Sequence, residues 1–559
     1  MRATLDKFLC NILDCELSNP VILNSTSRIG LIAAENDDEF LFKCFVDSSA
    51  LAELKNKDSS KMLLLGSTGA GKTAIIRKIE AESDRASLIE VREMALNYIG
   101  NSNVINFMIS LGVDLDIFFQ ALWKHVILLE FIRLKYNVND ENKSIIVFQR
   151  IKEAFANDHK KSKGLEYLQK WENKFWVSME ENVIEITQNL EKKVTAKIGA
   201  HLDKFIASAG YIRGLSTEKK TNLRRRIQEF SDPVLLSDLA QAINIQSGHA
   251  ISNELHFILI DQLDENWISP SIKYPMIRAL IESLKSLRRI NDLKTVVSLR
   301  SDLLEKVILE TKSAGFQSEK YEDYIVRLKW DNSKLKTLVN KRINFLYKRQ
   351  YSKENITFED IFNEKVNNSS KPFNTILDRT LYRPRDVINF VNMCFEAAEG
   401  ATFVSRKKFA VAEKGYSANR LQAMGEEWEN VISNADTILK LLKGKKHILK
   451  ISDFCNDDIL ENLVQHYPDS IIGQSDSLWE LVNNAMDNDK LYTYDMKLQL
   501  ASTLISKLHL MGAVGVKYDT NLPYQFFFVS QKYLATTQLH ENAKVKIHPM
   551  LHSALGIIH

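Results

Sequence analysis

The sequence predicts an α/β fold built on a parallel sheet, with a large helical insertion, a helical lid and a C-terminal winged helix. Three observations predict it. A glycine-rich turn joins an apolar run to a helical pattern at 61–80, two further apolar runs end in charged residues at 255–261 and 295–300, and no proline lies between Pro20 and Pro233. Apolar runs that alternate with helical patterns are typical of buried parallel strands. A long stretch without proline permits long helices.

The composition is that of a globular protein and excludes several other classes. The chain has 559 residues, 45% hydrophobic and 26% charged, which excludes disordered, collagen-like and low-complexity proteins. Its length predicts three or four domains. Lys plus Arg number 74 against 71 Asp plus Glu, a net charge of +3, so a wholly basic nucleic-acid coat is excluded while local basic patches are not.

Cysteine usage and hydropathy predict a cytoplasmic protein with no membrane partner. The five cysteines have no CxxC pair, which favours free thiols in a reducing compartment. The first 20 residues contain acids where a secretory signal has an apolar core. The most apolar stretch, 117–134, is interrupted by charged residues, so we expect a buried helix there rather than a bilayer span.

The pattern changes along the chain divide it into five segments. We expect an N-terminal segment with the first part of the core at 1–99, a helical insertion at 100–250, the second part of the core at 251–330, a helical lid at 331–425 and a winged-helix-like domain at 426–559. Within the insertion, apolar residues from Leu168 to Phe205 recur at steps of three or four, which predicts one apolar helix stripe. We expect this helix either to pack on its neighbours or to have a partner-binding or coiled-coil role.

The glycine-rich turn matches the phosphate-binding loop GxxxxGK[ST], or P-loop. The match consists of Gly66, Ser67, Thr68, Gly69, Ala70, Gly71, Lys72 and Thr73. Its glycines let backbone N–H groups turn toward phosphates, and the following helix adds its positive N-terminus. Lys72 is placed to bind the β and γ phosphates and Thr73 to bind Mg²⁺. Because no guanine-reading NKxD follows the loop, the expected nucleotide is ATP.

Acids that follow the apolar run 255–260 supply the carboxylates that such a site needs. Asp261 is the candidate to bind Mg²⁺. Without the glycine-rich loop upstream, an acidic helix cap would be an equally good interpretation of this residue. Asp264 or Glu265 is the candidate to polarise the attacking water. The roughly 180 residues between the two motifs exceed a minimal core, which is why an insertion is expected.

Arginines after the core strands are candidates to contact the nucleotide. Arg300 ends the run 295–300, and a cation at that place would face the γ phosphate from the carboxyl edge of the sheet. The alternative is a surface arginine at the end of a strand. Arg288 and Arg289 are candidates for a finger that reaches a neighbouring subunit, or solvated ends of a helix. In the YRPRD motif, Arg383, Pro384 and Arg385 either contact the nucleotide from the lid or form an ordinary helix start with Pro in its first turn.

The C-terminal region predicts a winged helix that binds DNA or a protein. Residues 514–519 and 524–530 are expected to form two strands around a turn, after several helices. The segment 401–450 holds ten Lys or Arg and five acids, a local charge of +5. Such a segment could contact the phosphates of a DNA backbone. The alternative is a basic helix face that is only solvated.

The order GSTGAGKT, ILIDQLDENW, VVSLRSD, YRPRDVINF resembles the P-loop ATPases of the STAND and KAP type within the AAA+-like group. The chain also resembles a bacterial P-loop ATPase family often found with phage-defence genes. The resemblance implies that Lys72 and Thr73 bind nucleotide and Mg²⁺, that Asp261 is the Walker B acid and that Arg300 is the sensor arginine. Gln262 stands where the simplest AAA+ pattern has Glu, which leaves the base open between Asp264 and Glu265.

Three functions are consistent with these features. The first is a Mg²⁺-dependent ATPase switch in anti-phage defence, which forms a homo-oligomer and acts with an effector protein. The second is a DNA-binding ATPase that loads or remodels proteins on duplex DNA. The third is a nucleotide-bound scaffold with little turnover, whose insertion helices are the working surface.

Overall fold

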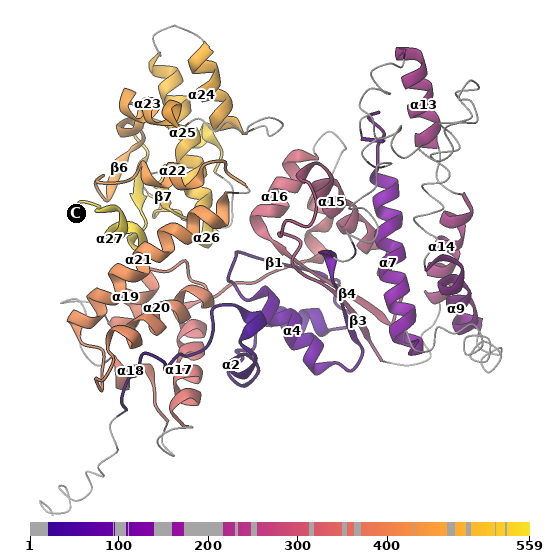
Figure 1. The fold of residues 1–559 in the computed structure, drawn as a ribbon, viewed down its shortest axis with the longest axis horizontal. Helices are drawn as coiled ribbons and strands as arrows, with labels where there is room; N and C mark the ends of the chain where they lie inside the picture. The colour runs from indigo at the N-terminus through magenta and orange to yellow at the C-terminus, as the bar shows by residue number, and fades with distance from the viewer. Residues whose placement is uncertain are drawn as a thin grey trace, which may run out of the picture. The chain divides into compact units, whose positions relative to one another are not determined.

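The computed structural model describes most of the chain outside the insertion. The described residues are 21–92, 94, 105, 108–109, 111–138, 159–172, 216–229, 233–247, 254–311, 318–348, 355–362, 371–429, 431–466, 476–487, 493–519, 521–530 and 534–559. They belong to two compact units (Figure 1). The first unit comprises 47–68 and 72–328, and the second comprises 1–46, 69–71 and 329–559, each without its undescribed residues.

The first unit is built on a five-stranded sheet in which every strand is parallel to its neighbours. Its strands are β1 (Leu63–Gly66), β2 (Ala86–Ile89), β3 (His256–Ile260), β4 (Leu293–Arg300) and β5 (Ile325–Arg327). The spatial order is β2-β3-β4-β1-β5. β1 and β3 are buried along their whole length, which explains why their sequences are continuous apolar runs. The predicted parallel α/β sheet is confirmed, while β5 had no signal in the sequence.

Helices cover both faces of this sheet. The helices of the first unit are α3 (Ser49–Lys55), α4 (Lys72–Glu82), α7 (Asp116–Tyr136), α9 (His159–Trp171), α13 (Thr217–Glu229), α14 (Pro233–Gln246), α15 (Pro270–Leu287), α16 (Ser301–Glu310) and the 3₁₀ helix η4 (Ser318–Tyr324). α4 lies on one face, and α15 and α16 lie on the other (Figure 1). α7 is the buried helix that the apolar stretch predicts, and it packs against α15 and β3.

The strand order creates a topological switch point at the carboxyl edge of the sheet between β1 and β4, the place where open α/β sheets have a ligand crevice. The connection from β1 runs to β2 at the far edge, whereas the connection from β4 runs the opposite way, to β5. Because parallel crossovers are right-handed, the two connections leave over opposite faces. Open α/β sheets bind ligands at such a switch point. Gly66 and Arg300 are register partners there, each the last residue of its strand.

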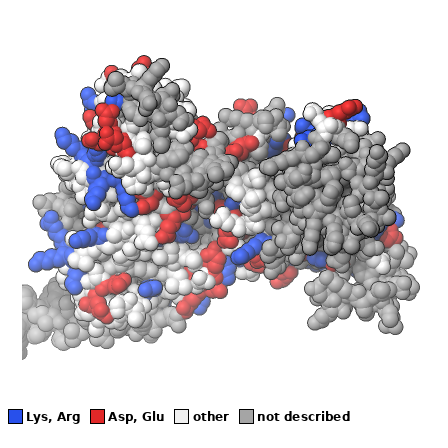
Figure 2. All heavy atoms as spheres, turned by 45° about the horizontal axis from the view of Figure 1, so that its top comes forward, with Lys and Arg blue, Asp and Glu red and all other residues white. Residues whose placement is uncertain are grey.

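The second unit is mainly helical and has one core. Its early elements are η1 (Ala34–Asn36), α2 (Asp38–Lys43), α17 (Asn332–Lys348), α18 (Phe358–Ile361), α19 (Pro372–Asp378), α20 (Pro384–Ala397) and α21 (Arg406–Trp428). Its later elements are α22 (Ala435–Lys440), β6 (Ile448–Lys450), η5 (Ile451–Phe454), α23 (Asp457–Gln465), α24 (Ser477–Asp487), α25 (Tyr494–Met511), β7 (Val514–Lys517), α26 (Phe527–Ser530), η6 (Thr536–Gln538), β8 (Lys544–Ile547), η7 (Pro549–Leu551) and α27 (His552–Leu555). Leu23 and Ile29 are buried in the same core as α17 and α20. On the face drawn in Figure 2, basic side chains gather on this unit.

The predicted C-terminal hairpin is wrong. β7 pairs with β8, and β6 completes an antiparallel sheet of order β6-β8-β7. Residues 524–530 contribute one bridge, Gln525 to Val516, and then form α26. The run YQFFFVS is apolar enough for a strand, but Phe527 is buried as part of a helical turn. The strand partner of β7 therefore comes from 544–547.

Two sequence predictions concern the insertion and the membrane. The apolar stripe from Leu168 to Phe205 lies outside the described residues beyond Glu172. In the part of the chain that the structure describes, none of the helices combines the length and apolar character that crossing a bilayer requires.

Candidate functional site

The glycine-rich loop joins β1 to α4 at the crevice. Gly69 and Gly71 have φ of +74° and +97°, a backbone region that residues with a Cβ rarely adopt. These two glycines turn the loop so that α4 begins at Lys72. The first N–H groups of a helix have no partner within it, so the start of α4 offers donors to an anion.

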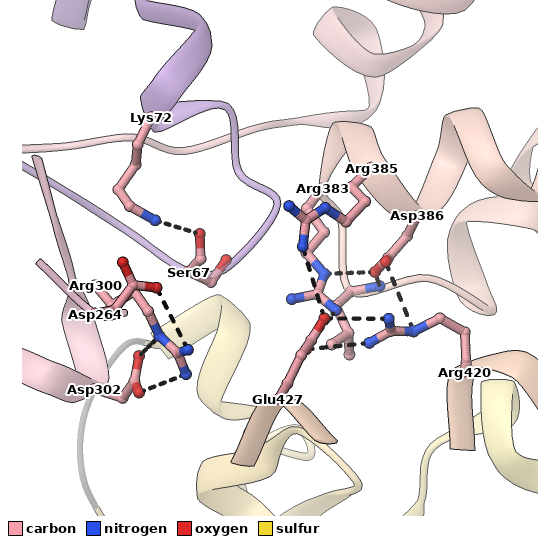
Figure 3. A network of polar contacts seen from close by, with 11 residues as sticks. Ser67, Lys72, Asp264, Arg300, Asp302, Arg383, Arg385, Asp386, Arg420 and Glu427 are labelled. Atoms are coloured by element: carbon pink, nitrogen blue, oxygen red, sulfur yellow. Dashed lines mark hydrogen bonds and ion pairs between the residues drawn. The ribbon is translucent and has the colours of Figure 1, made fainter. Parts of the chain in front are cut away.

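Lys72 lies folded over this loop. Its ammonium donates a hydrogen bond to the carbonyl oxygen of Gly66 at 3.2 Å. It donates another to the carbonyl oxygen of Ser67 at 3.1 Å (Figure 3). Burial of the ammonium lowers the pKa of Lys72, and the nearby carboxylates of Asp264 and Asp261 oppose that shift. The side chain is thus a buried cation near Asp264, Asp261 and Arg300, held by two neutral acceptors that a phosphate can replace.

Asp261 is the buried acid at the end of β3. The register that pairs Ile260 with Val297 places Asp261 beside Ser298. The Ser298 hydroxyl donates a hydrogen bond to the Asp261 carboxylate. This bond fixes one oxygen of the Asp261 carboxylate. Ser298 escaped prediction because its role depends on strand register.

Arg300 is held by two acids. Its guanidinium donates to both carboxylate oxygens of Asp302, with Nε–Oδ1 at 3.1 Å and Nη2–Oδ2 at 2.8 Å. Nη1 also lies 3.7 Å from Oδ2 of Asp264 (Figure 3). A bidentate pair of this kind orients a guanidinium firmly. Arg300 therefore lies between Asp264 and the start of α16, beside the end of β1.

The segment after β3 brings Asp264 back to the site. Gln262 has a φ of +61°, and this left-handed turn redirects the chain. Lys273 of α15 donates hydrogen bonds to the carbonyl oxygens of Asp264 and Glu265, both at 2.8 Å. Burial lowers the pKa of Lys273 to about 8. The Glu265 side chain is exposed, whereas that of Asp264 is half-buried beside Arg300.

In the second unit, Arg383 belongs to a buried ion-pair network. Its Nε donates to Asp386 at 2.7 Å and its Nη2 contacts Glu427 at 3.4 Å (Figure 3). Arg420 approaches the same two carboxylates, at 3.7 and 3.4 Å. Burial alone would raise the pKa of Asp386, but Arg383 and Arg420 outweigh it and hold that pKa below its usual range. Arg420, counted among the ten basic residues of 401–450, is therefore no part of a basic surface.

Arg385 lies against the tip of the glycine-rich loop, whose residues 69–71 belong to the second unit. Its backbone N–H donates to the Gly69 carbonyl at 3.4 Å, and a Cβ on Gly69 would lie 2.8 Å from the Cβ of Arg385. Trp330, another residue without a sequence signal, donates from Nε1 to the Ala70 carbonyl at 2.7 Å. Pro384 is the first residue of α20, as its ordinary helix-start reading predicts. Both arginines contact Glu427, Arg385 through Nη1 at 4.0 Å, but Arg383 is buried in the network whereas Arg385 is partly exposed and lies against the loop.

The donor set at the crevice fits a nucleotide carrying magnesium. Among the described residues, no group of three His, Cys, Asp or Glu side chains is arranged to hold a metal ion. Mg²⁺ at phosphate-transfer sites is bound by one or two protein oxygens together with substrate phosphates, so such a group is not required. Thr73 in the first turn of α4 and Asp261 after β3 are the residues that would supply those oxygens. The sequence also offered Arg288 as a candidate for an arginine finger. In the structure the guanidinium carbon of Arg288 lies 5.9 Å from the centroid of the Tyr324 ring.

Comparisons with known proteins give one family match and two relatives. Residues 333–425 match the FunZ-associated C-terminal helical domain, a range that lies within α17–α21. Over 549 residues the chain is 20% identical to the putative transposon gamma-delta 80.3 kDa protein of Escherichia coli (strain K12), covering 94% of this chain and 67% of that protein. Over 123 residues it is 26% identical to the allergen Alt a 2 of Alternaria alternata, covering 22% of this chain and 64% of that protein.

Proposed function

We propose that the chain is a P-loop ATPase that binds ATP with Mg²⁺ at the crevice between β1 and β4. The observation that carries this proposal is the position of Lys72. Lys72 follows a glycine-turned loop at the switch point of a parallel sheet, near Asp261 and Asp264, which follow β3, and near Arg300, which ends β4. A chance match to a short sequence motif would not be expected to bring Lys72, Asp261, Asp264 and Arg300 together in the fold.

Each residue then has a role in binding or chemistry. The backbone N–H groups of 67–71 and the start of α4 bind the phosphates, and Lys72 exchanges its two carbonyl acceptors for phosphate oxygens. Thr73 and Asp261 hold Mg²⁺, which neutralises charge on the β and γ phosphates. Ser298 orients Asp261 for this purpose.

Asp264 is the better candidate for the residue that polarises the attacking water. Its backbone is fixed by Lys273 and its carboxylate lies beside Arg300, whereas the Glu265 side chain is exposed. A general base must be held within reach of the proton that it abstracts. Arg300, held by Asp302, is placed to stabilise charge on the γ phosphate.

Nucleotide binding by paired lysine variants of α4 tests the proposal. Lys72→Ala should weaken equilibrium binding of a fluorescent ATP analogue by about a hundredfold or more, because a charged contact is worth several kcal/mol in such a site. Lys78→Ala is the matched control, since Lys78 lies on the same helix and pairs with Glu82 at 2.9 Å. Equal affinity in the two variants would contradict the site.

We further propose that ATP occupancy acts as a switch that sets a homo-oligomer and recruits an effector protein in anti-phage defence. Loop residues 69–71 pack with Arg385 and Trp330, so a loop that rearranges around phosphates also moves the start of α20. The resemblance to ATPases found with phage-defence genes supports the defence role. Phage plating on cells that carry wild-type or Lys72→Ala protein, with the neighbouring genes intact, tests it; equal protection by both would remove this role.

A second candidate function is an ATPase that acts on duplex DNA. Basic side chains gather on the second unit (Figure 2), and exposed Lys and Arg residues of α21 and of 440–450 contribute to its surface. The relative from Escherichia coli is described as a putative transposon protein, and a transposon is a DNA element. The predicted winged helix of 426–559 belongs to this candidate.

A further inference from the structure

A row of lysines crosses the outer face of the antiparallel sheet in the second unit. β8 is the central strand, and Lys544 pairs with Lys450 of β6 on one side and with Lys517 of β7 on the other. Residues directly opposite each other point to the same face of a sheet. The residues that alternate with them, such as Leu449 and Val545, are buried in the core. The three lysines therefore lie side by side on the outer face, which we call the lysine row.

This row is electrostatically unfavourable by itself. Neighbouring strands lie about 4.8 Å apart, and like charges directly opposite each other destabilise a sheet. In the described part of the chain, none of the three ammonium groups forms an ion pair with a carboxylate. Lysine on an edge strand can serve to block further strand pairing, which applies to Lys450 of β6 and Lys517 of β7 but not to Lys544 on the central strand. A polyanion that binds the row would remove the repulsion.

One end of the outer face is covered and the other is open. Phe526 covers Gly515 so closely that a Cβ there would lie 2.6 Å from its ring. Lys546, two residues from Lys544 on the same face, has its ammonium 5.7 Å from the ring centroid of Tyr524. The lysine row occupies the open end, with Lys450 and Lys544 exposed. Lys546 adds a fourth cation at its border.

We propose that the lysine row binds the phosphate backbone of duplex DNA. Duplex DNA is a dense polyanion, with one negative charge per about 1.7 Å of axis, so cations spaced about 4.8 Å apart each have phosphates within reach. Protein interfaces are depleted in lysine and enriched in aromatic residues and arginine, so a row of three lysines favours a polyanion. Lysine contacts to phosphate position DNA without reading its sequence. This inference rests on the second candidate function and names its contact surface.

The test measures binding of the full chain to a labelled duplex of about 30 base pairs at several salt concentrations. The variant combines Lys450→Gln, Lys517→Gln and Lys544→Gln. The matched control combines Lys57→Gln, Lys285→Gln and Lys320→Gln, which removes three exposed lysines from the first unit. We expect the row variant to bind about tenfold or more weakly at low salt, with a salt slope reduced by about 3, and the control to bind within about twofold of wild type. Thermal melting shows that both variants are folded.

The remaining outcomes separate this inference from the proposals beneath it. Equal weakening in both triple variants would overturn the lysine row, because net charge alone would explain it. If the row variant bound the duplex as tightly as wild type, the proposal that the lysine row binds DNA would also be overturned. DNA binding would then belong to another surface. A wild-type chain that does not bind the duplex at low salt would overturn both the row and the second candidate function. ATP binding, measured with Lys72→Ala, is independent of all three results.

Discussion

Lys273 fixes the segment that carries the proposed general base, through hydrogen bonds to the carbonyl oxygens of Asp264 and Glu265. Because burial lowers the pKa of Lys273 to about 8, its ammonium loses its proton as the pH rises through 8. Loss of that charge weakens both hydrogen bonds and removes a cation near Asp264 and Arg300. We predict that ATP turnover falls above about pH 8, whereas Lys273→Met is slow at every pH and lacks this step.

Lys285→Met is the control for this pH profile, because Lys285 is an exposed residue of the same helix. It should keep the wild-type profile. A fall above pH 8 that persists in Lys273→Met would show that another group titrates.

Single residues of the site were predictable where a motif fixes their spacing. Lys72, Thr73 and Asp261 follow from the loop pattern and from the acid after an apolar run. Arg383 and Arg385 are equivalent in the sequence, and only burial in the network distinguishes them. Lys273 and Ser298 were missed because their partners come from other elements, which no local pattern records.

The glycine-rich loop is an element whose shape can be tested directly. Gly69→Ala adds a Cβ at a φ of +74° and places it 2.8 Å from the Cβ of Arg385. The strain of about 1–2 kcal/mol and the clash both force the loop to shift. We predict a loss of ATP affinity of about tenfold or more, measured by equilibrium binding.

Gly400→Ala is a matched control for the loop. Gly400 has a φ of +75°, and an added Cβ there meets nothing within 4 Å. It carries the same backbone strain without the clash and should keep wild-type affinity. Comparable affinities for the two variants would contradict the proposed role of the loop.

Elements with a strong pattern were predicted well and short ones were not. β3, β4 and α7 follow from apolar runs in the sequence. β5 and β6 have three residues each, too few to show a period. The hairpin was wrong because the apolar run 524–530 satisfies a strand pattern and a buried helical turn equally well. Tertiary packing, which the sequence pattern does not show, decides between them.

At the scale of the whole chain, the parallel α/β core was predictable but the division into two units was not. The first 50 residues show no motif, yet Leu23 and Ile29 are buried with helices more than 300 residues away. Asp37 and Arg342 form a buried ion pair at 2.7 Å across the same distance in sequence. Such long-range pairings depend on packing and charge neutralisation in the folded chain. Strand order, which creates the crevice at Gly66 and Arg300, has the same origin.

Steady-state ATP hydrolysis by the purified full chain tests the central claim most directly. The measurement compares wild type with Asp261→Asn, Asp264→Asn and Glu265→Gln, all with Mg²⁺. We predict turnover by wild type, loss of about a hundredfold or more in Asp261→Asn and Asp264→Asn, and a change of a few-fold at most in Glu265→Gln. Wild-type turnover no greater than that of Asp261→Asn would contradict an ATPase at this site.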